Sequence, residues 1–212
     1  SDPSDTPEPW QITTDDILAL WQADFNLAEE QIAEGKTWEV FDLRSFAKWM
    51  IVTDLVLDNE IGHPKSCYIY KRGLGSEHKY EFGPLWDFDL SFNTAGINNG
   101  VISVNPFYGT LWLHPFFKEL TDTPEFMEVF REEWDIFQNE VYTELLEWID
   151  AYSSLIEPLA KLNGLRWPKP HNNGWVTARY NTFNNVAVVS ELKEWIIRRV
   201  EFIHTQIEKN TF

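Results

Sequence analysis

Cysteine and positive charge are both scarce in this sequence of 212 residues. Cys67 is the only cysteine, so no internal disulfide can form. There are 17 Lys and Arg residues against 34 Asp and Glu residues, which gives a formal net charge of -17. The negative field repels phosphate backbones and anionic lipid surfaces, so we expect no nucleic-acid partner. No apolar run is long enough to cross a membrane, and we expect no membrane span.

Aromatic residues, in contrast, are abundant and account for 16% of the chain. With 43% hydrophobic and 24% charged residues, the composition excludes the disordered and collagen-like classes. A chain of this length buries about 70% of its unfolded surface when it folds. The proline-rich segment 1–9 is typical of a linker, and residues 10–212 are predicted to form a single domain, expected to be monomeric.

Apolar residues at helical spacing predict most of the structure. A first helix begins at Thr13 or Thr14 and stops near Gly35, and a second is capped by Asp42 and ends at the polar cluster 58–60.

Later helices are predicted to begin at Thr123 and Pro124 and near Glu140, with Pro158 expected to kink or end the latter. A last helix covers 188–207. Five tryptophans that recur at helical spacing are expected in the core: Trp21, Trp49, Trp134, Trp148 and Trp195.

Between the helices, two short β-type runs at 67–71 and 78–82 flank a glycine turn and predict an antiparallel hairpin. Segment 83–92 is interpreted as a strand end that opens into a loop, and 93–110 as a long surface loop. The predicted fold class is therefore α+β, mostly helical, with a small hairpin sheet.

Asp87 and Asp89 have the spacing that places two side chains on the same face of a strand. Two adjacent carboxylates repel each other unless a cation intervenes, which makes a Mg²⁺ site one interpretation. The alternative is that one aspartate caps a turn while the other is solvated.

The segment DNEIGHPKS at 58–66 follows an apolar helix and precedes the hairpin. Acidic residues in such a place are typical of the catalytic loop of phosphoryl-transfer enzymes, where a carboxylate orients the attacking hydroxyl. The alternative is a loop whose polar groups satisfy the end of the helix.

Two motifs, HPKS-x-YIYK and GPLWDFD, resemble the spore-coat protein H (CotH) kinase-like family, and the similarity extends over about 40–210. The resemblance implies the C-terminal lobe of an atypical protein kinase. Family members use ATP and Mg²⁺ to phosphorylate protein substrates outside the cytoplasm or at the cell surface.

The resemblance also implies roles for individual residues. Asp87 would hold the metal and Asp89 would support it. The catalytic acid would be Asp58 or Glu60, and the choice stays open. The remaining loop residues implied to contact phosphate or to shape the loop are Asn59, His63 and Lys65.

The sequence departs from the family pattern in two places. Glu60 stands where an aspartate is expected, and a misplacement of about 1 Å can cost on the order of 100-fold in rate. Nothing before Trp38 supplies the phosphate-covering loop and lysine of an N-terminal lobe, so that lobe is interpreted as absent from this chain. We therefore expect that this segment alone neither binds ATP tightly nor transfers phosphate.

A carbohydrate-binding or non-catalytic cell-surface interaction module is the alternative function. Aromatic faces stack on sugar rings, and Trp112, Trp167 and Trp175 lie in or near predicted loops. That alternative predicts exposed, coplanar rings without a convergent acid cluster.

Overall fold

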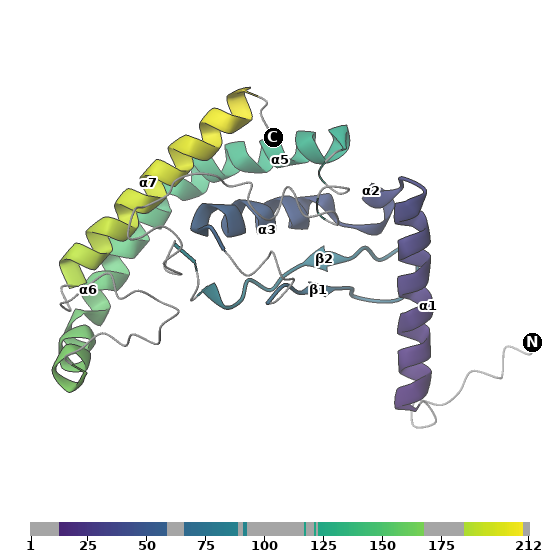
Figure 1. Cartoon of the computed structure of the whole chain (residues 1–212), viewed down its shortest axis with the longest axis horizontal. Coiled ribbons are helices and arrows are strands. Elements are labelled where there is room, and N and C mark those ends of the chain that lie inside the picture. The colour runs from purple at the N-terminus through teal and green to yellow at the C-terminus, as the bar shows by residue number, and fades with distance from the viewer. Residues whose placement is uncertain are drawn as a thin grey trace, which may run out of the picture.

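The computed structural model describes residues 13–58, 66–88, 91–92, 117, 121, 123–167 and 185–209. This part of the chain is mostly helical and contains one small antiparallel sheet, as the sequence predicted (Figure 1). The elements in chain order are α1 (Thr14–Ala33), α2 (Thr37–Val40), α3 (Leu43–Val56), β1 (Ile69–Tyr70), β2 (Glu81–Phe82), α5 (Pro124–Ile136), the π-helical turn η5 (Phe137–Val141), α6 (Tyr142–Arg166) and α7 (Asn185–Lys209).

Side-chain caps fix where three helices begin. Thr13, Asp42 and Thr123 each accept a hydrogen bond from the backbone N–H three residues further on, at the starts of α1, α3 and α5. These bonds satisfy donors that a helix start otherwise leaves without a partner. The predicted starts of these three helices are confirmed.

Helix α3 lies in the middle of the core, and Phe46 is its most enclosed aromatic residue. Its side chain has no exposed surface, and its ring centroid lies 4.4 Å from that of Phe82 and 4.9 Å from that of Phe126. These contacts join α3 to β2 and to α5. Trp49, Trp134 and Trp195 are also buried, as predicted.

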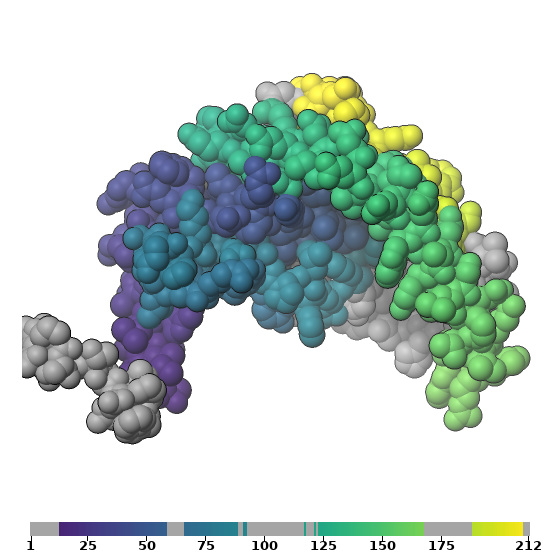
Figure 2. Space-filling model, turned by 180° about the vertical axis from the view of Figure 1, so that it is seen from behind, coloured from purple at the N-terminus to yellow at the C-terminus, as the bar shows by residue number. Residues whose placement is uncertain are grey.

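Two other tryptophans are not in the core, which corrects the prediction for them. Trp21 is 39% exposed on α1, and Trp148 is 65% exposed on α6. Both helices project from the same side of the layer formed by α3 and the hairpin (Figures 1 and 2). Periodicity identifies an apolar helix face, but it does not show that another element covers that face.

One of the two expectations for Pro158, that it ends the helix, is wrong. Pro158 lies inside α6, which continues to Arg166. Pro158 therefore does not end it.

The hairpin is shorter than predicted, with Ile69 paired to Phe82 and Tyr70 to Glu81. Residues 83–87, expected to continue the second strand, have no regular secondary structure. The predicted loop at 93–110 lies outside the described residues.

Candidate functional site

The C-terminal end of α3 leads directly into the predicted catalytic loop. Leu57 adopts a left-handed conformation with φ of 51°, and its N–H donates to the carbonyl of Asp54 at 3.1 Å. The N–H of Asp58 donates to the carbonyl of Thr53 at 3.0 Å. The helix end is thus closed by its own next two residues.

Helix α7 supplies two side-chain donors to the same helix end. Trp195 Nε1 donates to the carbonyl of Leu55 at 3.3 Å, and Arg199 Nε donates to that of Asp54 at 2.8 Å. Arg199 is fully buried, and a cation is favoured at a helix C-terminus because the helix dipole is negative there.

The last carbonyl of α3 accepts from a third part of the chain. The N–H of Phe92 donates to the carbonyl of Val56 at 2.6 Å. Because Asp58 lies two residues after Val56, the segment that follows Asp87 returns to the point where the predicted catalytic loop begins. The four final carbonyls of α3 therefore all have partners, as a buried helix end requires.

Asp87 lies at the open end of the hairpin. Ser66 precedes β1 and Asp87 follows β2, so antiparallel pairing brings the two residues to the same end. The Ser66 hydroxyl donates to Asp87 Oδ2 at 3.4 Å, which is long for such a bond. Asp87 is exposed, and its carboxylate retains further acceptor positions.

Left-handed backbone is concentrated in this region. The described non-glycine residues with positive φ are Leu57, Ser66, Asp87 and Phe92. Such conformations cost free energy, and they cluster at functional sites because the surrounding structure must enforce them. The φ value of 63° at Asp87 also shows that this residue is not in a strand. The prediction that Asp87 and Asp89 share one face assumed a strand at this position, and that assumption is wrong.

Comparison with known proteins supplies the family. A family model described as CotH kinase protein matches residues 5–203. The chain belongs to this family. The resemblance seen in the sequence is thereby confirmed, while comparison with curated proteins and with solved structures finds no match.

The two motifs that carried the CotH resemblance meet in the structure. Ser66 belongs to HPKS-x-YIYK, and Asp87 belongs to GPLWDFD. Of the predicted site residues, the structure therefore places Asp58 at the end of α3 and Asp87 at the hairpin. The others lie outside the described residues: Asn59, Glu60, His63, Lys65 and Asp89.

Sequence reasoning missed the buried charges behind the site. Asp54 is 3% exposed, and Arg199 approaches it from α7. No motif pointed to either residue, because their proximity depends on packing between helices far apart in the chain. Ser66 lies within the HPKS-x-YIYK motif, but the motif alone indicates no role for this residue.

The donor atoms at Asp87 suit a hard cation. A carboxylate and a hydroxyl supply oxygen ligands, the type that Mg²⁺ prefers. Within the described ranges no three His, Cys, Asp or Glu side chains gather as a metal-binding group. No helix in that part of the chain combines the length and apolar character of a membrane span.

Proposed function

We propose that this chain forms the C-terminal lobe of a CotH-type protein kinase in which Asp87 is the principal metal-holding residue. Membership of the family supports the kinase-like assignment. The contact between Ser66 and Asp87 carries the proposal, because it joins the two family motifs at one position. The left-handed backbone at both residues supports a functional constraint there.

Asp87 and Asp89 would hold Mg²⁺, which supplies charge neutralisation at the phosphates of ATP. Ser66 would fix the orientation of the Asp87 carboxylate by donating to one oxygen. The requirement for a cation follows from the net charge of -17, because the chain would otherwise repel a polyanionic nucleotide.

Glu60 is the better of the two acidic candidates for orienting a substrate hydroxyl. Asp58 is only 7% exposed, and its backbone is tied to the end of α3. A residue that contacts substrate must be accessible, so we assign Asp58 to supporting the loop. We place Asn59, His63 and Lys65 in the same loop, contacting phosphate or shaping its path.

The proposed substrate is a protein, and the proposed location is extracytoplasmic or at the cell surface, with the chain acting as a monomer. Tight nucleotide binding would need an N-terminal lobe that residues 1–212 do not supply, since its lysine and phosphate-covering loop were not found in this sequence. This segment alone is therefore proposed to be inactive.

Titration with Mg²⁺ and a non-hydrolysable ATP analogue tests the proposal, using this chain and a longer form extended at its N-terminus. Phosphate transfer is then measured on the longer form. Asp87→Asn should lower transfer by roughly 100- to 1,000-fold, the usual cost of losing one preorganised electrostatic group. Asp135→Asn, an exposed aspartate on α5, is the matched control and should change nothing.

A non-catalytic surface module is the alternative if the longer form binds no nucleotide and Asp87→Asn has no effect. Its carbohydrate-binding version depends on exposed rings. Trp167 is exposed, and Trp148 stacks on the exposed Tyr152 with centroids 5.1 Å apart. Trp112 and Trp175 lie outside the described residues.

A further inference from the structure

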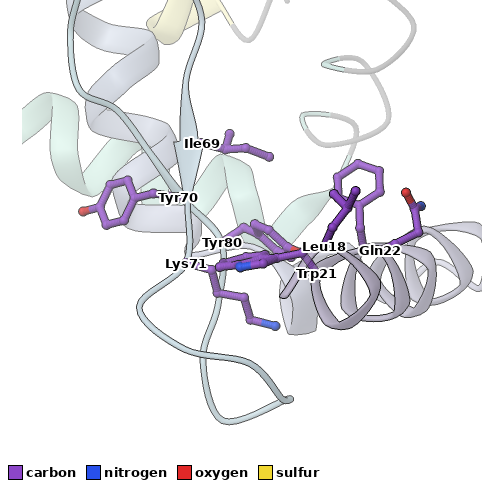
Figure 3. A pocket seen from close by; sticks show the side chains of 8 residues that line it. Leu18, Trp21, Gln22, Ile69, Tyr70, Lys71 and Tyr80 are labelled. Carbon is purple, nitrogen blue, oxygen red and sulfur yellow. The ribbon is translucent and has the colours of Figure 1, made fainter. Parts of the chain in front are cut away.

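An apolar groove runs between α1 and the hairpin, near the hairpin turn and at the opposite end from Ser66 and Asp87. Its volume is about 490 Å³, within the range of ligand pockets. Leu18, Trp21 and Gln22 line the α1 side of the groove, and Trp21 extends toward Tyr80 of the hairpin (Figure 3). Leu18 is 64% exposed and Ile69, on the hairpin side, is 40% exposed, so large apolar surfaces meet solvent here.

The lysine that lines the groove is already paired with a carboxylate, so its charge is not free to bind a ligand. Lys71 lines it, but its Nζ lies 2.7 and 2.9 Å from the two carboxylate oxygens of Asp24. Tyr80 donates to the same carboxylate at 2.9 Å. Because the lysine is neutralised, the groove does not suit a phosphate or another anionic ligand.

An acidic residue lies beyond each end of the row of α1 side chains that lines the groove. Asp15 lies three residues before Leu18, and Glu29 lies four residues after Phe25, so both continue the lining face of α1. Both are exposed. They are separated by about 21 Å along the helix axis, at 1.5 Å per residue. Helix α1 contains no Lys, Arg or His residue.

We propose that this groove binds an amphipathic helix of a partner polypeptide that carries an apolar stripe and basic residues beyond both ends of it. The stripe would fill the groove between α1 and β1, and Lys or Arg side chains about 14 positions apart would pair with Asp15 and Glu29. A second copy of this chain is the poorer occupant, because each copy brings a net charge of -17 and the same acidic ends. The proposal is independent of phosphoryl transfer.

A designed probe tests the surface on the full chain. The probe is a fluorescein-labelled peptide of about 18 residues, with Leu on one helical face and Lys elsewhere. Two comparison peptides are a permuted form with the same composition but no apolar face, and a form with Glu in place of Lys. Binding is followed by fluorescence anisotropy at about 0.15 M salt, where long-range attraction is screened.

Leu18→Asp should weaken binding of the amphipathic Lys peptide by about 10-fold or more, because it places a charge in the apolar contact. Leu162→Asp is the matched control, since Leu162 is 61% exposed on α6, and it should leave affinity unchanged. The double variant Asp15→Asn/Glu29→Gln should weaken binding about 3- to 10-fold. Circular dichroism checks that each variant keeps its helix content.

Equal binding of the amphipathic and permuted Lys peptides would overturn the proposal, because bulk charge alone would then explain the affinity. Equal or tighter binding of the Glu peptide would contradict the charge argument. Unchanged affinity in Leu18→Asp would remove the groove from the interface. A dimer in sedimentation that Leu18→Asp dissociates would assign the surface to a second copy instead.

Discussion

Replacing Lys71 with methionine removes the cation that neutralises Asp24 between α1 and the hairpin. The lysine and aspartate side chains are only 6% and 7% exposed. After the substitution, the Asp24 carboxylate would keep two donors, the Gly75 N–H at 3.0 Å and the Tyr80 hydroxyl at 2.9 Å. Methionine has a similar length, so the perturbation is loss of charge with little loss of volume.

The expected cost follows from the burial of this pair. Removing one partner of a buried ion pair typically costs about 3–5 kcal/mol, because the other charge stays buried without compensation. The two remaining hydrogen bonds stabilise the carboxylate, so we expect the lower end, about 3 kcal/mol. Replacing both residues, as Asp24→Leu/Lys71→Met, should recover much of this loss, since an apolar pair leaves no buried charge.

A double-mutant cycle measured by urea unfolding tests this reasoning. We expect a coupling energy of about 2–3 kcal/mol between the two sites. Amide hydrogen exchange within α1 shows whether the loss appears as local detachment of that helix or as global unfolding. Additive single variants, with Lys71→Met costing under about 1 kcal/mol and leaving exchange in α1 unchanged, would show that the pair behaves as a solvated surface pair.

Two further predictions concern the core and pH. Phe46→Ala should destabilise the chain by about 3–5 kcal/mol in urea unfolding, because it opens a cavity among enclosed rings, whereas Leu162→Ala on the surface of α6 should change little. Burial raises the pKa of the Asp24 carboxyl, but hydrogen bonds from Lys71, Gly75 and Tyr80 outweigh it and hold the pKa below its usual value. The stabilisation is therefore complete above the unfolded pKa of about 3.9 and is lost as pH falls through the folded value. Melting temperatures of the wild type and Asp24→Asn should converge below about pH 4, and a constant difference down to pH 3 would contradict this prediction.

Local signals predicted the helix starts because a cap acts over three residues. Each cap accepts a hydrogen bond from the backbone N–H three positions further on, and that spacing can be read from the sequence at Thr13, Asp42 and Thr123. Trp21 and Trp148 show where such reasoning fails. Their spacing indicated apolar faces correctly, but whether a face is covered depends on elements elsewhere in the chain.

The candidate site was predictable in its motifs but not in its geometry. Ser66 and Asp87 stand 21 residues apart, and the predicted hairpin explains why they meet. The side chain of Asp87 could not be oriented from the sequence, because alternation implied a strand where the backbone turns left-handed.

The arrangement around the end of α3 had no sequence signal, because it depends on backbone carbonyls, which every residue carries. Trp195 reaches the carbonyl of Leu55 across 140 residues of chain, and Phe92 reaches that of Val56 from beyond the hairpin. A helix end with its carbonyls satisfied cannot shift without losing several hydrogen bonds at once. The C-terminal end of α3, from which the predicted catalytic loop starts, is therefore held by α7 and by Phe92, and substitutions in either should loosen this helix end even where they do not contact Asp58.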